Sequence, residues 1–302
     1  MFAGKTAFVT AVRRKNNEIE FHEMPKRDKH WVSVLKKIPF VRGLVGIIDS
    51  SAKGSQFLNF SAEAYAEDEV GPETDQDVKK EKEKEKGGMF SSFTVILSVA
   101  VVGILSFIVG KLIFTLVPVF VEDFIFGSSF ENQIIHNLLE GAIKIVLLLV
   151  YLYAISQTPL IKRLFQYHGA EHKVISAYEA GLELTVSNVQ KFNTLHYRCG
   201  SSFIVFTVLV GVIIYSFLTY DTLWERIYQR LLLLPIVIGV SYEVLKATNS
   251  VREYPVLRYL GYPGLWLQLL TTKEPNDAQV EVAIASFNRV LELDNRLVEE
   301  IS

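Results

Sequence analysis

The sequence has little cysteine and little excess charge of either sign. Cys199 is its one cysteine, so the chain can form neither an internal disulfide bond nor a structural zinc site of four cysteines. Lys and Arg total 31 against 33 Asp and Glu, and the net charge is −2. A nucleic-acid-binding protein carries a basic excess that this chain lacks. We therefore expect no nucleic-acid partner.

An apolar stretch is also missing from residues 1–16, so no cleavable signal peptide is expected. The chain is nevertheless 50% hydrophobic with a mean hydropathy of +0.26, more than a soluble protein of this size needs. Its apolar residues gather in four internal windows, Phe93–Gly110, Ile145–Ile161, Phe203–Tyr220 and Leu231–Tyr242. A membrane crossing takes roughly 20 mostly apolar residues. We predict four transmembrane helices, with buried core helices of a soluble domain as the alternative.

The flanking charges predict how these helices are oriented. Five lysines between Lys79 and Lys86 precede the first window, whereas the stretch Val121–Gly141 contains no Lys or Arg. Basic residues return in the central loop and in the early C-terminal tail. Because cytoplasmic loops carry the excess of Lys and Arg, both termini and the central loop are expected to be cytoplasmic.

The fold class predicted is mainly α, a polytopic membrane protein with a helical cytoplasmic loop and a small N-terminal β element. The β element is a hairpin of Thr6–Val12 and Glu18–Phe21. An amphipathic helix from Pro39 to about Phe60 is predicted to lie on the membrane or to pack on the cytoplasmic domain. A second one, Asp277–Glu300, begins at a cap on Asn276 or Asp277. The expected parts are an N-terminal cytoplasmic region (1–65), a charged linker (66–88), a transmembrane domain (89–247) with a cytoplasmic loop (159–202), and a C-terminal tail (248–302) with an interfacial stretch.

The central loop is predicted to form one helix. Thr158 and Pro159 are typical of a helix start, and Gly181 is typical of a helix end. Along such a helix an apolar stripe that includes Leu160 and Leu164 also carries three ionisable residues, His168, His172 and Glu179. Burying ionisable groups is costly unless they are paired or bound to a metal, so this stripe is a candidate site.

The motif His168-x-x-Glu171-His172 places two imidazoles one helical turn apart with a carboxylate between them. Such a pair can bind one metal ion, with the glutamate acting as general base. We expect a divalent ion, zinc in the first place. A third ligand would be Glu179, or His196 and Cys199 of the string HYRCG; the candidate ligands are His168, His172, Glu179, His196 and Cys199. The alternative is a histidine pair in a helical core, hydrogen-bonded to Glu179, Glu243 or backbone, without a metal.

Several strings are characteristic in combination: IPFVRGLVGIIDSSAKGSQFLNFSAE, FQYHGAEHKVISAYEAG, HYRCGSSF, GVSYE and PGLWLQLLTTKEPNDAQVEVAI. In this order they resemble the YqhQ-like bacterial membrane family, a domain of unknown function described as metal-dependent enzymes. The resemblance implies a metal site on His168, Glu171 and His172, and less directly on His196 and Cys199. It also implies a multi-pass protein of the bacterial cell membrane.

Two departures from that family pattern stand out. The family usually begins with a GGQAVIEGVM-type segment, whereas this chain begins MFAGKTAFV, so a glutamate supplied by that segment is expected to be missing from the site. Where the family typically has proline in the HYRCG string, this chain has Tyr197. The turn before Cys199 is therefore expected to differ.

Two functions of different class follow. The first is a cytoplasm-facing metal-dependent centre of hydrolase type at the membrane surface, acting on a lipid, a membrane-bound peptide or a soluble metabolite. The second is a non-enzymatic membrane scaffold or assembly factor, whose cytoplasmic helices bind membrane or cytoplasmic protein partners. A transporter is a third and less favoured function, because Glu140 and Lys144 are spaced to pair and few other charges that could form a transport path lie within the windows. Membrane lipids are expected as partners in each case.

Overall fold

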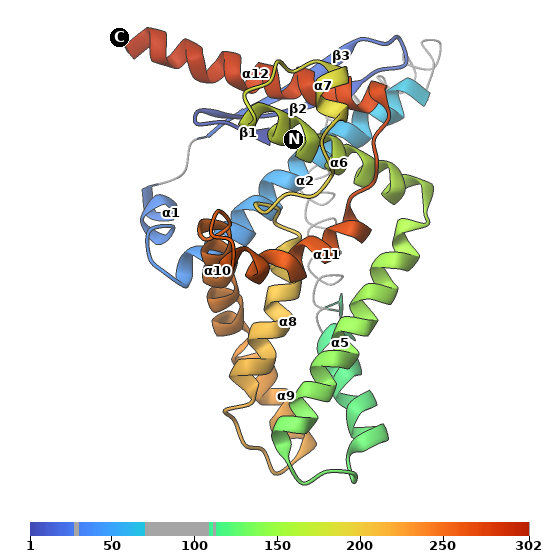
Figure 1. The fold of residues 1–302 in the computed structure, drawn as a ribbon, viewed down its shortest axis with the longest axis vertical. Coiled ribbons are helices and arrows are strands. Elements are labelled where there is room, and N and C mark those ends of the chain that lie inside the picture. Colours follow the sequence, from blue (N-terminus) through green and yellow to red (C-terminus); the bar gives the residue numbers. More distant parts are fainter. Residues whose placement is uncertain (27–29, 70–108, 111–112, 302) are drawn as a thin grey trace, which may run out of the picture.

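The computed structural model describes residues 1–26, 30–69, 109–110 and 113–301. Helices dominate these residues, and one small sheet lies at the N-terminus (Figure 1), as predicted. The helices are α1 (His30–Leu35), α2 (Val41–Glu69), a helix over residues 113–126, α5 (Gln133–Ser156), α6 (Pro159–Glu179), α7 (Val186–Gln190), α8 (Ser202–Tyr215), α9 (Leu223–Leu232), α10 (Leu234–Ser250), the 3₁₀ helix η1 (Leu257–Gly261), α11 (Tyr262–Thr271) and α12 (Asp277–Ile301).

The sheet is antiparallel with the order β1-β2-β3, built from β1 (Phe2–Ala3), β2 (Ala7–Arg13) and β3 (Ile19–Pro25). In its register Phe2 lies opposite Val9 and Arg13 lies opposite Ile19. Asn17 occupies the tight turn between β2 and β3 with a φ of 66°, a conformation that asparagine tolerates well. The predicted hairpin is thus confirmed. The two-residue strand β1 is too short to give a pattern in the sequence.

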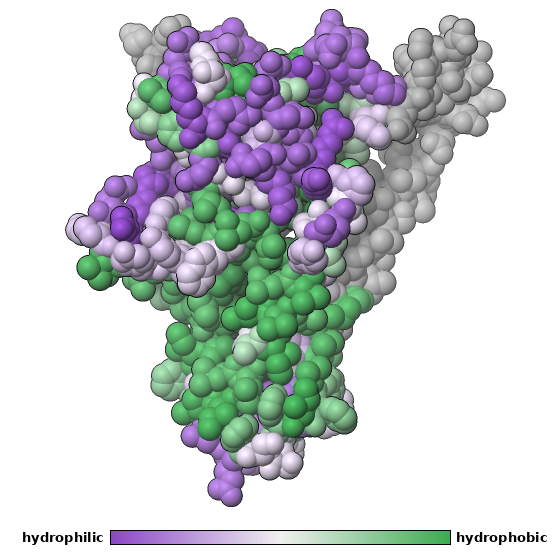
Figure 2. Space-filling model, turned by 45° about the vertical axis from the view of Figure 1, so that its right-hand side comes forward, coloured by the Kyte–Doolittle hydropathy of each residue, from purple (hydrophilic) through white to green (hydrophobic). Residues whose placement is uncertain are grey.

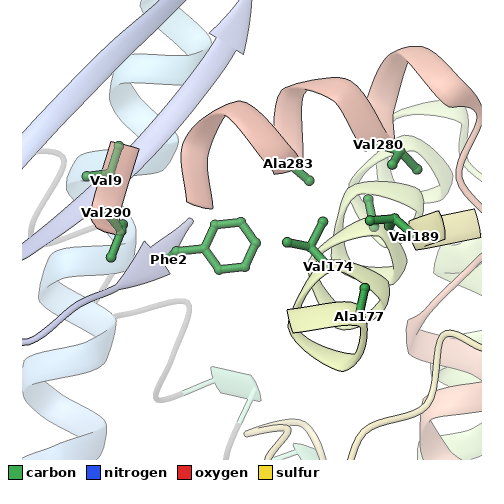
Figure 3. Close-up of a cluster of buried hydrophobic side chains, with 9 residues drawn as sticks. Phe2, Val9, Val174, Ala177, Val189, Val280, Ala283 and Val290 are labelled. Atoms are coloured by element: carbon green, nitrogen blue, oxygen red, sulfur yellow. The ribbon is translucent and has the colours of Figure 1, made fainter. Parts of the chain in front are cut away.

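The sheet, α6, α7 and α12 form a compact polar part around their own core, shown in Figure 3. Its buried residues are Phe2, Val9, Ala170, Val174, Ala177, Val189, Val280, Ala283 and Val290. Helix α12 begins with a capping box, in which the Asn276 side chain accepts a hydrogen bond from Gln279 N and the Gln279 side chain accepts one from Asn276 N, both at 2.9 Å. The cap predicted at Asn276 is therefore confirmed. Because its valines and alanine lie in this core, the apolar face of α12 is already covered.

Helices α5, α8 and α10 form the apolar part of the molecule, and Figure 2 shows a continuous hydrophobic band over it, below the polar part. Many of their large apolar side chains face outward; exposed examples on α5 are Ile134, Leu138, Val146, Val150 and Tyr153. Within the described residues, α5 is long and apolar enough to cross a membrane, and the bent pair α9 and α10 passes the same test if it counts as one broken span. Helix α8 is apolar but shorter.

The boundaries of the predicted spans need correction. The window Ile145–Ile161 crosses a helix end, because α5 stops at Ser156 and Ile161 belongs to α6. The third helix ends at Tyr215 rather than Tyr220, and the fourth window contains a bend of 52° between α9 and α10. Hydropathy averages over such breaks. Two of them coincide with Pro159 and Pro235 at the starts of α6 and α10. Most of Phe93–Gly110 and of the charged linker lies outside the described residues.

Helix α2 packs against α10 of the apolar part and also contacts β2 of the polar part, whereas it was predicted to lie on the membrane or on the cytoplasmic domain alone. It continues to Glu69, beyond the predicted end near Phe60. Arg42 at its start pairs with Glu243 of α10 through two guanidinium nitrogens, and the backbone amide of Phe40 donates to the same carboxylate at 3.1 Å. The charge of Glu243, the residue that follows the fourth window, therefore has a partner from the N-terminal region.

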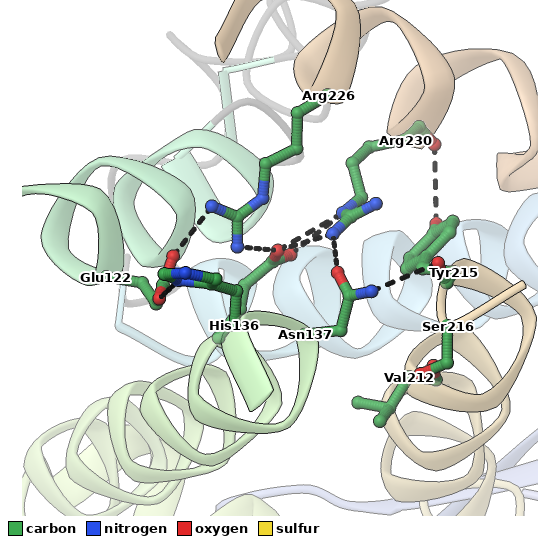
Figure 4. A network of polar contacts seen from close by, with 9 residues as sticks. Glu122, His136, Asn137, Val212, Tyr215, Ser216, Arg226 and Arg230 are labelled. Carbon is green, nitrogen blue, oxygen red and sulfur yellow. Dashed lines mark hydrogen bonds and ion pairs between the residues drawn. The ribbon is translucent and has the colours of Figure 1, made fainter. Parts of the chain in front are cut away.

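A buried network of charged side chains joins α5, α9 and the helix over residues 113–126 at the end far from the polar part (Figures 1 and 4). Glu140 accepts hydrogen bonds from Arg226 at 2.8 Å and from Arg230 at 2.7 Å. Arg226 also donates to Glu122 at 2.6 Å, and all four side chains are at most 4% exposed. The predicted pairing of Glu140 with Lys144 thus missed its arginine partners. Buried charges are more numerous in this part than the sequence indicated.

Candidate metal centre

Helix α6 supplies two of the candidate ligands. It begins at Pro159, as predicted, and the chain turns away at Gly181, whose φ of +70° favours glycine. Thr158 occupies the N-cap position, but its hydroxyl donates to Ile155 O rather than capping α6. The helix runs unbroken through Gly169, which lies against the carbonyl oxygen of Lys273 where a Cβ would not fit. This glycine therefore marks close packing and not a bend.

The apolar face of α6 differs from the predicted stripe. Leu160 is 78% exposed and Leu164 is 45% exposed, so the burial expected along the predicted stripe is not found at these two residues. The face that packs on α12 consists of the smaller residues Ala170, Val174 and Ala177. Alanine permits close helix contacts but contributes less to a hydropathy pattern than leucine does. His168 and His172 lie on a different face, which is turned toward the HYRCG loop and the end of α11.

Three of the predicted ligands come together in the structure. One ligand atom each from His168, His172 and Cys199 lies within 4.8 Å of the other two. Nδ1 of His168 is 2.9 Å from the carbonyl oxygen of Thr271, and Nδ1 of His172 is 2.6 Å from that of Thr194. Because a carbonyl only accepts, both Nδ1 atoms carry the proton. This leaves Nε2 of each ring as the atom able to bind a metal ion.

Cys199 approaches from the loop that precedes α8. Its Sγ lies 3.2 Å from Nε2 of His168 and 3.0 Å from Oγ of Ser201, and the residue is 6% exposed. Burial alone raises the pKa of the thiol, but hydrogen bonds with His168 and His172 outweigh it and lower the pKa to about 5. The thiolate, which is the form that binds metals, is thus favoured at neutral pH.

His196 and Glu179 lie beside this group but outside it. The ring centroids of His196 and His172 are 5.8 Å apart. Nδ1 of His196 accepts a hydrogen bond from the Arg198 amide at 3.3 Å, and its Nε2 lies 3.5 Å from Glu179. Burial lowers the pKa of His196, so the neutral ring is favoured. Glu179 also binds the Arg198 guanidinium at 2.7 Å. Both residues therefore have partners away from the three ligand atoms.

Glu171, the predicted general base, is on α6 between the two histidines. Its side chain is 28% exposed, and its carboxylate contacts the amino group of Met1. Burial, the largest effect, lowers the pKa of His168. The contacts with Cys199 and Thr271 and the negative charge of Glu171 outweigh it and raise this pKa. The carboxylate therefore lies close enough to the centre to influence it electrostatically.

Sequence reasoning missed the residues that hold the ligands in place. The main one is Gln268 of α11, which is fully buried. Its amide oxygen accepts from His196 N at 2.9 Å, and its nitrogen donates to His196 O at 2.9 Å and to Ser202 Oγ at 2.9 Å. A buried glutamine in an apolar helix was the available signal. The carbonyls of Thr194 and Thr271 leave no trace in a sequence, because every residue has one.

The donor set fits a divalent transition metal. Two imidazole nitrogens and a thiolate suit zinc, and both rings have the backbone hydrogen bonds that usually orient metal-binding histidines. Among the described residues no fourth His, Cys, Asp or Glu joins the group. Three protein ligands with an open position are typical of catalytic zinc sites, whereas structural sites have four.

The family model for proteins of unknown function called DUF1385 matches residues 38–293, so the chain belongs to this family. It is similar to a protein of Bacillus subtilis (strain 168) described as "Uncharacterized protein YqhQ", with 50% identity over 294 residues that cover 97% of this chain and 90% of the relative. The resemblance seen in the motifs is confirmed at the level of the family. No solved structure matches the chain.

Proposed function

We propose that this protein is an integral membrane protein of the bacterial cell membrane with a cytoplasm-facing, metal-dependent centre of hydrolase type. Support for membrane insertion comes from α5, from the apolar helices α8 and α10, and from the hydrophobic band of Figure 2. Trp224 and Tyr228 are exposed at one end of this band and Tyr254 and Trp266 at the other. Aromatic side chains concentrate at the two membrane–water interfaces in this way.

The proposed topology is multi-pass. Its spans within the described residues are α5, α8 and the broken pair α9 and α10; the predicted window Phe93–Gly110 lies mostly outside these residues. The absence of Lys and Arg from Val121–Gly141 favours an outer position for the turn before α5, and the polar part then lies in the cytoplasm with both termini. Membrane insertion is tested by washing membranes with alkaline carbonate. Release of the chain into the supernatant would contradict it.

The convergence of His168, His172 and Cys199 carries the metal proposal. Three residues from two separate segments place ligand atoms within 4.8 Å, with each Nδ1 fixed by a carbonyl. A core histidine pair without a metal has no need of a nearby thiolate. A divalent ion, zinc above all, would supply Lewis acidity to a substrate at the open position.

The residues around the centre have separate roles in this proposal. His168 and His172 bind through Nε2, and Cys199 binds through its thiolate. Glu171 acts as general base, accepting a proton at a carboxylate oxygen, since it is the acidic group of α6 between the two histidines. Gln268 holds the backbone of the HYRCG loop, so that Cys199 stays in reach of α6.

The scaffold function receives less support from the structure. It relies on free amphipathic helices, and the apolar face of α12 is buried against α6 and the sheet. Exposed apolar residues are concentrated on the helices of the hydrophobic band, where lipid would cover them. A partner protein would therefore have to bind the surface of the polar part, which consists of the sheet, α6, α7 and α12.

The experiment is elemental analysis of detergent-purified protein prepared without chelator. About one metal ion per chain is expected, with loss of the ion in His168→Ala, His172→Ala and Cys199→Ser. The exposed His30 in α1 provides a control variant, His30→Ala, that should keep the ion. Glu171→Gln should also keep it, because a general base is not a ligand. Equal metal content in all variants, or none in the wild type after zinc loading, would overturn the proposal.

A further inference from the structure

Arg258 stands on the short helix η1 among tyrosine side chains. It is exposed, and its guanidinium lies 5.3 Å from the ring centre of Tyr259. A hydrogen bond with Tyr259 raises the pKa of Arg258, and the phenols of Tyr262 and Tyr197 act in the same direction. Within the described part of the chain, no carboxylate is among the groups that raise the pKa of Arg258. The positive charge thus lies beside a phenol ring and has no carboxylate partner among these residues.

The surroundings of Arg258 are aromatic and apolar. The rings of Tyr259 and Tyr262 are 4.9 Å apart, and those of Tyr262 and Trp266 are 6.4 Å apart. Large apolar side chains beside them point to the outside, namely Tyr254 (61% exposed), Val256 (76%), Leu257 (43%), Leu260 (56%) and Trp266 (65%). The exposed surface therefore combines one arginine with phenols and a surrounding apolar area.

This surface lies where the hydrophobic band ends. In Figure 1, α11 and the upper end of α10 lie at the same height as α1, between the apolar helices and the polar part. Helix α1 and its following loop also expose apolar side chains at this level, among them Trp31 at 60% and Phe40 at 55%. In a membrane of the proposed topology this height corresponds to the headgroups of the cytoplasmic leaflet.

The HYRCG loop connects this surface to the metal centre. Tyr197 comes two residues before Cys199 in the sequence. Its ring packs on Gly261 at the end of η1, where a Cβ would come within 2.8 Å of the ring. The preceding residue of the loop, His196, is held by Gln268 of α11. One loop thus carries both a metal ligand and one of the phenols near Arg258.

We infer that Arg258, with the phenols of Tyr197, Tyr259 and Tyr262, binds the phosphate group of a phospholipid in the cytoplasmic leaflet. A guanidinium can donate two parallel hydrogen bonds to phosphate oxygens, and phenol hydroxyls can add further donors. The neighbouring exposed apolar residues would contact the acyl chains. Basic pockets on the cytoplasmic side of membrane proteins bind anionic headgroups in this manner. The inference rests on the proposed membrane placement but not on the metal.

The inferred lipid site is tested by native mass spectrometry of the full chain in detergent, which measures the fraction bound to the probe dioleoylphosphatidylglycerol. Arg258→Gln is expected to reduce the lipid-bound fraction about tenfold, the effect of losing a charge-assisted hydrogen-bonded pair, and Arg258→Lys is expected to retain part of it. Lys246→Gln is the matched control, because Lys246 is an exposed cation near the same end of α10. It should bind lipid like the wild type.

Three results would overturn the inference. The first is that Arg258→Gln binds as much lipid as the wild type. The second is that Arg258→Gln and Lys246→Gln weaken lipid binding equally, which would indicate only a general attraction between charges. Soluble glycerol phosphate could saturate the site at the concentrations at which the lipid does, which would assign it to a free phosphate ester. Metal content is measured on the same samples and should not change in Arg258→Gln. Loss of lipid binding and loss of the metal are thus separate outcomes, and carbonate extraction tests the membrane placement independently.

Discussion

Nδ1 of His168 lies 2.9 Å from the carbonyl oxygen of Thr271, the last residue of α11. The hydrogen bond fixes the ring so that Nε2 faces Cys199, and it connects α6 of the polar part to the end of α11. The candidate metal centre is thus located where the apolar and polar parts of the molecule meet. His168 and His172 belong to the polar part, and Cys199 belongs to the loop that leads into the apolar part. The distances between these ligand atoms therefore depend on how the two parts pack together.

The first prediction concerns Gln268, which contacts no candidate ligand side chain. Gln268→Leu should weaken zinc binding by about tenfold or more, the usual effect of losing a group that orients metal ligands. The substitution removes three hydrogen bonds, two to the backbone of His196 in the HYRCG loop and one to Ser202 at the start of α8. Competition with a chromogenic chelator measures the affinity. Gln157→Leu, at an exposed position after α5, is the control. An unchanged affinity in Gln268→Leu would show that the loop holds its shape without this side chain.

A second prediction concerns stability. Gly169→Ala places a Cβ against the carbonyl oxygen of Lys273 and should destabilise the protein by about 2 kcal/mol, as overpacking commonly does. Gly54→Ala in α2 is the matched control, because a Cβ there meets no atom within 4 Å. It should be neutral or stabilise by up to about 1 kcal/mol through its higher helix propensity. Thermal unfolding in detergent measures both variants. A Gly169→Ala protein as stable as the wild type would mean that the segment after α11 can move away.

The third prediction concerns the buried charges of Figure 4. Arg230→Met should destabilise the protein by about 3–5 kcal/mol, because it removes donors from Glu140 and leaves a buried carboxylate with less compensation. Glu140→Met should have a similar effect. The double variant should recover part of the loss, since neither charge then lacks its partner. Additive losses in the double variant would show that these side chains are not energetically coupled.

The fourth prediction is a pH dependence in the polar part. Asp294 of α12 accepts hydrogen bonds from the amides of Lys5 and Thr6 at 2.8 and 2.9 Å, and from the Thr6 hydroxyl at 2.7 Å. Burial raises the pKa of Asp294, but these hydrogen bonds outweigh it and hold the pKa below 3.8. A carboxyl with a lowered pKa stabilises the folded state above its unfolded value, and this contribution disappears as the pH falls through the folded value.

Acid should therefore loosen the turn between β1 and β2 from α12 below about pH 4. Hydrogen exchange of the amides of Lys5 and Thr6 measures this release. Asp294→Asn should show faster exchange already at neutral pH and a weaker acid dependence. Identical pH profiles for the two proteins would show that another group controls the change.

Parts of this structure could be predicted because local chemistry determines them. Pro159 and Gly181 delimit α6, and the spacing of His168 and His172 by one turn places their rings on one face of it. The cap at Asn276 follows from side chains that satisfy nearby backbone groups. Each of these features depends on residues close together in the sequence.

Other parts depended on contacts between distant segments. Three candidates for a third ligand were open. Contacts of α6 with the end of α11 and with the segment before α8 bring Cys199 to the histidines, while His196 and Glu179 pair with each other. The arginine partners of Glu140 lie on α9 and follow no local spacing rule. The apolar face of α6 was misplaced because two of its three core residues are alanines, which carry a weaker signal than the exposed Leu160 and Leu164.

X-ray absorption spectroscopy of the zinc-loaded protein tests the central claim most directly, because it reports the atoms around the ion. The predicted first shell contains one sulfur at about 2.3 Å and two imidazole nitrogens at about 2.0 Å, the distances typical of zinc. The sulfur contribution should disappear in Cys199→Ser. A shell without sulfur in the wild type, or a sulfur signal that survives in Cys199→Ser, would contradict a centre formed by His168, His172 and Cys199.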